Sequence, residues 1–353
     1  MFRKKRFYLF VFTVVISVVL AACSNDRIRS EASTDGEEIT LKFAHEEGQG
    51  DVQDLYANKF KEVIEEKTNG RIKVDVYTGG TLGTSIDILH SLQTGAIELA
   101  ITSPGFSGDV IPESQIMSIP FLFSDNLEVN KKVLQESEAL NGLLADKYEE
   151  IGVIPFHFWL EGFMYWTANQ EITAPEDMNG IKMRTMPTNL IIRSYEHLGA
   201  TPTTTDSGEI YTMLQTNGID GQENPLFYIV NGNFLEVQDY LMDTKHHIYT
   251  TVTVTNQEFF EGLAKEDQQI IEEAIDEVND WSFDMQEEEA EKALKKAKED
   301  DIEIIELTSE QREAFEELSL PIREVYGEES NDAKAIIEML EKEIKEAEAD
   351  LTE

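Results

Sequence analysis

A short segment that occurs twice in the chain constrains the fold more than any other feature. Residues 92–98 read Leu-Gln-Thr-Gly-Ala-Ile-Glu, and residues 214–220 read Leu-Gln-Thr-Asn-Gly-Ile-Asp. Each copy follows a helix-like apolar pattern and opens a strand-like run. Chance similarity is the alternative, but the shared context favours two β-α-β-α-β units. Such units predict two similar α/β lobes.

The first unit is built from alternating and helical apolar patterns. Alternation of apolar and polar residues predicts strands at 39–43, 72–76 and 97–101. Apolar residues at steps of three and four predict helices over 51–69 and 84–94. This part of the chain therefore has the order expected of one α/β lobe.

The second unit contains an apolar-alternating strand pattern that begins at Ile181 and ends in Arg184. Helix-like segments run to Leu198 and from 209 to 216. Open α/β sheets hold ligands at the carboxyl edge of their strands, and a guanidinium there offers a planar cation. We therefore expect the candidate ligand site at this edge.

Aromatic and β-branched runs connect the two units. Residues 156–159 and 164–167 flank Glu161-Gly162, and residues 246–255 are rich in β-branched side chains. Two strands that cross between lobes make a hinge, and the cleft between lobes is a favoured ligand site. Beyond residue 257 the pattern is helical, and we assign these helices to packing.

The charge balance excludes some classes of partner. The formal net charge is −41, and the acidic residues are spread along the whole chain. Such a surface repels nucleic acid and anionic lipid, so neither is expected as a direct partner. An acidic, well-solvated surface explains the composition, and no segment has the spacing of an EF-hand calcium loop.

The first residues predict secretion. Four basic residues, 3–6, precede an apolar run over 7–19, and Leu-Ala-Ala-Cys closes it at Cys23. This pattern predicts a signal peptide over residues 1–22, because a membrane-spanning helix needs about 20 apolar residues. The last four residues resemble a bacterial lipobox, which implies that Cys23 is lipidated. Residues 23–38 are then a flexible linker, and the lone cysteine allows no internal disulfide.

Several motifs of the second unit resemble those of one receptor family. They are Lys182-Met183-Arg184, Gly199-Ala200-Thr201-Pro202, Glu209-Ile210-Tyr211 and Asp220-Gly221-Gln222-Glu223-Asn224-Pro225. They are similar to the signature of DctP-type solute receptors, the extracytoplasmic binding proteins of tripartite ATP-independent periplasmic (TRAP) transporters. The similarity runs from about Ile39 to about Gln269.

The resemblance implies an α/β, two-lobed periplasmic-binding-protein fold with central β-sheets flanked by helices. It also implies an interlobe cleft and a long C-terminal helix that spans both lobes. We expect lobe I to comprise residues 39–160 and 251–285. Lobe II would then comprise residues 161–250 and 286–353.

Three residues of the second unit have implied roles. In the family, the arginine that matches Arg184 clamps the carboxylate of the ligand, and the asparagine that matches Asn224 donates to the same group. Glu223 either orients Arg184 or faces solvent. Without the resemblance, Arg184 would be a surface ion pair and Asn224 a turn residue.

The resemblance also bears on the ligand. Many dicarboxylate receptors have a second arginine where this chain has Met164. Five segments resemble instead the ectoine-binding branch: residues 45–47, 50–54, 103–106, 184–186 and 224–227, the last of which ends in Phe227. There, the glutamate that matches Glu47 pairs with a cationic ring, and the phenylalanine that matches Phe106 packs on it. A zwitterion needs one anion-binding and one cation-binding group, and this pattern has both.

One position departs from that branch. It places a tryptophan before the Gly-Glu-x-Tyr motif, and this chain has Ser207 there. Trp159, Trp166 or Tyr228 can supply an aromatic face instead, although such residues more often belong to the core. The solute is then a relative of ectoine or another organic acid, and a C4-dicarboxylate is the alternative.

Metal, cofactor and catalytic patterns are missing from the sequence. No histidine pair has helical i, i+4 spacing, and His246 and His247 would face opposite sides of a strand. There is no nucleophile elbow and no phosphate-binding glycine loop. We expect no enzyme, metal or cofactor, but a receptor that hands a small carboxylate-bearing solute to TRAP permease subunits in the membrane. A secreted hydrolase with a carboxylate pair and an adhesive envelope protein are the alternatives from other classes.

Overall fold

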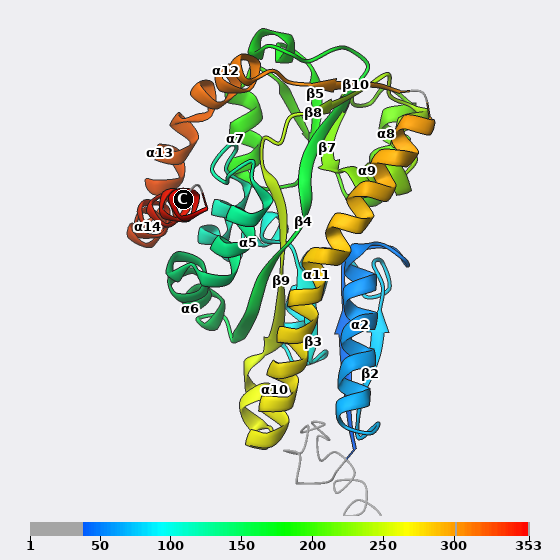
Figure 1. Ribbon diagram of the computed structural model, residues 1–353, viewed down its shortest axis with the longest axis vertical. Coiled ribbons are helices and arrows are strands. Elements are labelled where there is room, and N and C mark those ends of the chain that lie inside the picture. Colours follow the sequence, from blue (N-terminus) through cyan, green and yellow to red (C-terminus); the bar gives the residue numbers. More distant parts are fainter. Residues whose placement is uncertain (1–37, 301, 352–353) are drawn as a thin grey trace, which may run out of the picture.

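The computed structural model describes residues 38–300 and 302–351 (Figure 1). The predicted signal peptide, Cys23 and residues 23–37 of the linker lie outside the described residues. Among the described helices, none is long and apolar enough to cross a membrane. The prediction of a lipid anchor at Cys23 therefore stays a prediction.

The first lobe is built on three parallel strands. β1 (Ile39–Ala44) lies between β2 (Ile72–Tyr77) and β3 (Leu99–Thr102). The helices that connect and follow these strands are α2 (Val52–Lys67), α3 (Ser85–Gln93), α4 (Pro104–Ser107), η1 (Pro112–Ser118), α5 (Leu127–Glu136), η2 (Ala139–Leu144) and α6 (Ala145–Glu149). The strand and helix order predicted from the apolar patterns is confirmed.

The second lobe repeats this arrangement. β5 (Lys182–Thr185) pairs in parallel with β6 (Thr201–Thr204) and with β7 (Gly221–Pro225). Its other elements are η3 (Pro175–Met178), α7 (Asn189–His197), η4 (Ser207–Glu209), α8 (Ile210–Gln215), α9 (Leu226–Asn231) and η5 (Phe234–Glu236). Arg184 is thus one residue from the carboxyl end of a strand, where the pattern placed it.

The duplicated segment makes the same turn in both lobes. Gly95 after α3 has a φ of +70°, and Asn217 after α8 has a φ of +56°. The next amide reaches back to the helix in each case, from Ala96 to Ser91 at 2.9 Å and from Gly218 to Met213 at 2.8 Å. Glycine and asparagine are the residues that best adopt this left-handed helix end. The two copies are therefore structural equivalents.

Two long strands join the lobes. β4 (Val153–Ala168) pairs with β9 (Ile248–Asn256) in one lobe and with β7 in the other. The sheet has the order β2-β1-β3-β9-β4-β7-β5-β6, and β8 (Tyr240–Asp243) and β10 (Glu303–Glu306) extend it from β4. The β4–β9 register shifts between Leu160 and Gly162, and Gly162 has a φ of +148°. The crossing strands thus bend where they pass between the lobes.

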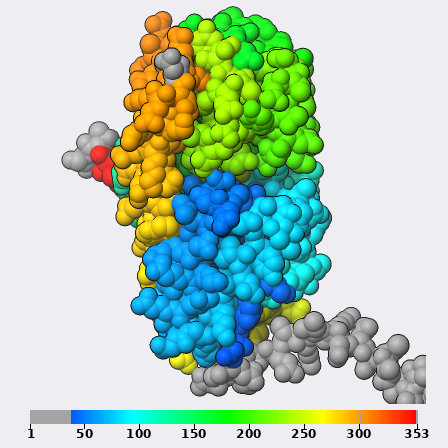
Figure 2. All heavy atoms as spheres, turned by 90° about the vertical axis from the view of Figure 1, so that its right-hand side faces the viewer, coloured from blue at the N-terminus to red at the C-terminus, as the bar shows by residue number. Residues whose placement is uncertain are grey.

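One helix spans both lobes. α10 (Gln257–Gly262) is followed by α11 (Lys265–Glu299), a helix of 35 residues. α11 packs against α2, β4 and α9, so it contacts both lobes along its length (Figure 1). Figure 2 shows it, in yellow and orange, beside the blue and cyan first lobe and the green second lobe. This confirms the expected long C-terminal helix.

The last helices divide between the lobes. α12 (Ser309–Ser319), capped by Thr308, contacts α7 of the second lobe. α13 (Pro321–Gly327) leads to α14 (Asn331–Asp350), which packs on α5 and η2 of the first lobe. The apolar face of α14 shares a core cluster with Leu134 and Leu140. We expected residues 286–353 to belong to lobe II, whereas α14 packs on elements of the first lobe.

Candidate functional site

A small polar pocket lies where the two lobes meet. Its volume is about 30 Å³, which holds roughly two water molecules. Residues of both lobes and of the crossing strand β9 line it: Glu46, Glu47, Ser85 and Phe106 from the first, Arg184, Met186, Ser207, Asn224, Pro225 and Tyr228 from the second, and Tyr249 from β9. The walls are therefore close together in this structure.

Arg184 brings a buried cation to the second-lobe wall. Its side chain is 2% exposed, and its Nε and Nη2 donate to the carbonyl oxygen of Thr205 at 3.1 and 2.9 Å. Among the described residues, no carboxylate lies within ion-pair distance of this guanidinium. Burial lowers the pKa of Arg184 below its ordinary value. A buried, uncompensated guanidinium is a ready site for an anion.

Three carboxyl groups, the half-buried Glu46 and the buried Glu47 and Glu161, lie on the first-lobe side. Glu46 Oε1 accepts from the main-chain amide of Ser103 at 2.9 Å. Glu47 Oε2 accepts from the Gln53 amide, and Glu161 Oε1 accepts from Gln53 Nε2, both at 2.9 Å. The part of the chain that the structure describes brings no lysine or arginine within 4 Å of these carboxylates.

The protonation of this group reflects its burial. Loss of solvation raises the pKa of Glu46 to about 8 and that of Glu161 to about 7. Burial also raises the pKa of Glu47 well above its ordinary range, and the charge of Glu161 adds to the effect. A cation that enters the pocket would favour the ionised forms of these groups, because an opposite charge nearby lowers a carboxyl pKa.

Aromatic and hydroxyl side chains form the rest of the lining. Phe106, Tyr228 and Tyr249 supply ring surface, and Ser85 and Ser207 add hydroxyl groups. Tyr228 is largely buried, which raises its pKa. Tyr228, named from the sequence as an aromatic substitute for the missing tryptophan, is therefore in the pocket, and Ser207 is beside it in the lining.

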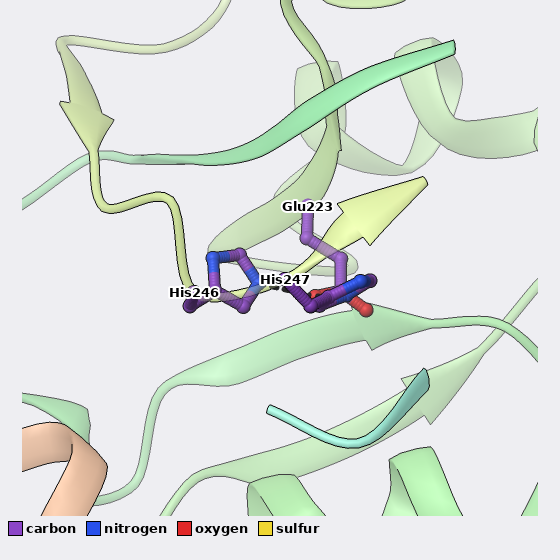
Figure 3. A group of neighbouring side chains, drawn as sticks. All are labelled: Glu223, His246 and His247. Carbon is purple, nitrogen blue, oxygen red and sulfur yellow. Dashed lines mark hydrogen bonds and ion pairs between the residues drawn. The ribbon is translucent and has the colours of Figure 1, made fainter. Parts of the chain in front are cut away.

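Asn224 and Glu223 alternate on β7 and face different surroundings. Asn224 lines the pocket, and its Nδ2 donates to Gln222 Oε1. Glu223 is 1% exposed and contacts two histidines on the far side of the strand (Figure 3). No ion pair joins Glu223 to Arg184 among the described residues, and Glu223 is not exposed to solvent. Its contacts therefore match neither of the roles expected from the sequence, which were orienting Arg184 and facing solvent.

The contacts of Glu223 converge on one oxygen. His246 Nε2 lies 2.8 Å and His247 Nε2 lies 3.2 Å from Glu223 Oε2, and the Tyr195 hydroxyl donates to the same atom. Burial opposes the charge of Glu223, but the nearby His247 and the hydrogen bonds outweigh it and hold its pKa below the usual range. Burial lowers the pKa of His246 to about 4.

The positions of His246 and His247 differ from those expected from the sequence. His246 and His247 were expected to face opposite sides of a strand. They lie instead in the connection between β8 and β9, and both rings turn toward Glu223 (Figure 3). Strand alternation holds only where the backbone is extended throughout, and this connection is not.

Three other predicted site residues lie away from the pocket. Trp159 is fully buried, stacks on Tyr56 with ring centroids 4.5 Å apart, and donates to Thr253 Oγ1. Met164 is 1% exposed and pairs with Pro225 across β4 and β7. Phe227 is buried on α9 and lies in a core cluster. Core packing explains all three positions.

Some lining residues were missed by sequence reasoning. Glu46 and Met186 lie in segments that carry the resemblance but were not named as site residues, and Tyr249 shows no distinctive pattern. Glu161, which lies behind the lining, was not named because a chain this acidic gives little reason to single out one carboxylate. A glutamate inside the aromatic run 156–166 was a usable signal for Glu161, because a charged residue is rarely placed among apolar ones without a partner.

The family relationship is decided by a match over most of the chain. The family model DctP, described as bacterial extracellular solute-binding protein, family 7, matches residues 43–329. The chain belongs to the DctP family. It is therefore a two-lobed extracytoplasmic solute-binding protein and not an enzyme, as the resemblance implied.

Individual members of the DctP family are similar over nearly the whole chain. The ectoine-binding periplasmic protein TeaA of Halomonas elongata is 39% identical over 289 residues, which cover 81% of this chain and 84% of TeaA. The ectoine/5-hydroxyectoine-binding periplasmic protein UehA of Ruegeria pomeroyi is 34% identical over 338 residues, 95% of this chain and 97% of UehA. The solved structure of TeaA from its TeaABC TRAP transporter superposes with a TM-score of 0.84 at 37% identity, covering 87% of this chain and 99% of TeaA.

Proposed function

We propose that this protein is the solute receptor of a TRAP transporter and that its cargo is a small zwitterion of the ectoine kind. The carboxylate of the solute would pair with Arg184, and its cationic group would face Glu47 and Glu161. The observation that carries the proposal is that the buried Arg184 and the carboxyl groups of Glu46 and Glu47 line opposite walls of a single pocket, with Glu161 held behind them by Gln53.

The proposed binding of the solute carboxylate depends on the geometry of Arg184. Two of its nitrogens are held by the Thr205 carbonyl oxygen, which fixes the plane of the guanidinium. Asn224 borders the same pocket from the adjacent strand. A carboxylate placed between them would gain charge-assisted hydrogen bonds in a site that excludes most water.

The carboxyl groups that would face the cationic end of the solute argue against a dicarboxylate ligand. The second carboxylate of such a ligand would meet Glu46, Glu47 and Glu161 without a basic residue to balance it. Met164, where many dicarboxylate receptors have an arginine, is neutral and buried away from the pocket. A dianion would keep these carboxyl groups protonated and gain no ion pair from them, whereas a cation gains one, so a zwitterion fits better than a C4-dicarboxylate.

Ser207 bears on the choice among zwitterions. In place of the tryptophan of the ectoine-binding branch, this chain presents a small hydroxyl side chain next to Tyr228. Phe106 and Tyr228 supply aromatic surface for a ring cation, which contributes about 0.5–2 kcal/mol when desolvated. The hydroxyl groups of Ser207 and Ser85 in the lining favour a ligand with an additional polar substituent, such as hydroxyectoine.

Capture would proceed by closure of the lobes. Only when both walls approach can one solute contact Arg184 and Glu47 together, and this difference in contacts favours the closed form. The crossing strands β4 and β9 and the bend at Gly162 provide the hinge. We also propose that a lipid on Cys23 holds the receptor at the outer face of the membrane, near the permease subunits.

Isothermal titration of the purified chain tests the proposal. Ectoine, hydroxyectoine, succinate and malate are titrated separately into the protein. We expect saturable one-to-one binding of a zwitterion and little heat from the two dicarboxylates. In a thermal-shift assay, a ligand at 100 times its Kd should add about 2.7 kcal/mol of stability. Tight succinate binding without ectoine binding would overturn the zwitterion assignment.

A further inference from the structure

The cluster of Glu223, His246 and His247 is separate from the pocket lining and has features of a metal site. One ligand atom from each residue lies within 4.8 Å of the other two. All three side chains are at least 95% buried. Figure 3 shows both imidazole rings directed toward the carboxylate. None of these residues is needed to explain solute capture.

The ring nitrogens are oriented for ligation. His247 Nδ1 lies 3.0 Å from the carbonyl oxygen of Ile248, which can only accept, so Nδ1 carries a proton. Nε2, 3.2 Å from Glu223 Oε2, is then the nitrogen that a metal ion would bind, in place of the proton that bridges the two atoms. His246 is held in a similar way, with Nδ1 2.6 Å from Thr244 Oγ1 and Nε2 facing the same carboxylate. Such outer hydrogen bonds typically fix the tautomer of metal-binding histidines.

The spacing of the atoms also fits an ion. Tetrahedral zinc with ligand bonds near 2.0–2.2 Å places its ligand atoms about 3.3 Å apart. The two nitrogens are 2.8 and 3.2 Å from Glu223 Oε2, so shifts of a few tenths of an ångström would admit the ion. The three residues also border a cavity of about 10 Å³.

A second observation points to an absent ligand. Glu223 Oε1 is buried and has no hydrogen-bond partner among the described residues, although buried carboxylate oxygens are normally satisfied. The Tyr195 hydroxyl donates to Glu223 Oε2 and holds that carboxylate in place. Trp166 and Phe121 pack around the His246 ring and keep bulk water away.

We propose that Glu223, His246 and His247 form a buried binding site for a divalent transition-metal ion, with Zn²⁺ as the best match. Two imidazole nitrogens and one carboxylate are ligands that zinc accepts in proteins. The ion would link Glu223 on β7 to His246 and His247 in the connection between β8 and β9. Because Asn224 is the next residue on β7, the metal would stiffen one wall of the solute pocket.

Cobalt titration of the purified chain tests this site. The protein is treated with EDTA, dialysed and titrated with Co²⁺, whose visible absorption reports low-coordinate binding. We expect one Co²⁺ per chain, displaced by Zn²⁺, and a thermal midpoint that rises with Zn²⁺ concentration. Glu223→Gln and His247→Gln should weaken binding at least tenfold, and His90→Gln, a change at an exposed histidine, should not.

Anomalous diffraction from a Zn²⁺-soaked crystal of the unaltered chain locates the ion without a variant. A peak between the two Nε2 atoms and Glu223 supports the proposal. Absence of cobalt bands, equal binding in the three variants, or a peak only at surface carboxylates would show that the cluster is held by hydrogen bonds alone and would overturn it. Solute titration is unaffected by these outcomes, so the two proposals fail separately.

Discussion

Glu47 and Glu161, which lie far apart in the chain, are joined through the single residue Gln53. The Gln53 amide donates to Glu47 and its side-chain nitrogen donates to Glu161, each at 2.9 Å. Helix α2 therefore begins by fixing two carboxyl groups at the edge of the solute pocket. This arrangement keeps both groups buried, without a basic partner among the described residues, and available to a cationic ligand.

Stability of the ligand-free protein should fall as the pH rises from about 5 to about 8. The pKa of Glu161 is raised from 4.5 to about 7 and that of Glu46 to about 8, mainly by burial. A raised carboxyl pKa contributes stability that is present below the unfolded value and is lost as the pH passes the folded value. Urea denaturation at pH 5, 6, 7 and 8 measures this decline.

A variant isolates the contribution of one carboxyl. In Glu161→Gln, the fall in unfolding free energy between pH 5 and pH 8 should be smaller by on the order of 2–3 kcal/mol, since one pKa unit corresponds to about 1.4 kcal/mol. If the variant shows the same pH dependence as the unaltered chain, the raised pKa of Glu161 is wrong. Because the rest of the acidic surface is unchanged, its general repulsion cancels in the comparison.

Binding of a cationic solute near pH 7 should release protons. A positive group beside Glu46, Glu47 and Glu161 favours their ionised forms, so bound protons leave. Titration of ectoine in phosphate and in Tris buffer, which differ in ionisation enthalpy, should give different apparent enthalpies. Identical enthalpies in the two buffers would mean that these carboxyls do not meet the cation.

Gly162→Ala should destabilise the protein by about 1–3 kcal/mol. Gly162 has a φ of +148°, a conformation that residues with a Cβ rarely adopt. The nearest atoms to a new Cβ are 3.5 Å away or more, so backbone strain and not a clash causes the loss. Gly262→Ala is the control, because nothing lies within 4 Å and its φ is ordinary. Equal unfolding free energies for the two variants would exclude strain at the hinge.

Much of the architecture could be predicted from the sequence for a physical reason. Apolar periodicity reports which face of a strand or helix is buried, so the elements of both units were recovered. The duplicated turn at Gly95 and Asn217 depends on local backbone preference, which is also visible in sequence. Arg184 was found because a strand-end cation is a local pattern.

The rest depended on packing between distant segments. α14 returns to the first lobe because its apolar face fits the surface of α5 and η2, and periodicity does not say which surface an amphipathic helix will cover. Glu161 becomes a site residue only through Gln53, and the two histidines meet Glu223 only because their connection is irregular. Tertiary contacts of this kind leave no local signal.

The most direct test of the account is a calorimetric titration of ectoine into the unaltered chain and into Arg184→Lys. Lysine keeps the charge but loses the paired donors, and hydrogen bonds to charged groups contribute about 1.5–3 kcal/mol. Affinity should fall roughly 10- to 150-fold with the unfolding free energy preserved. Arg193→Lys, at an exposed position on α7, should bind like the unaltered chain. Equal affinity in Arg184→Lys and Arg193→Lys would contradict the claim that Arg184 holds the solute.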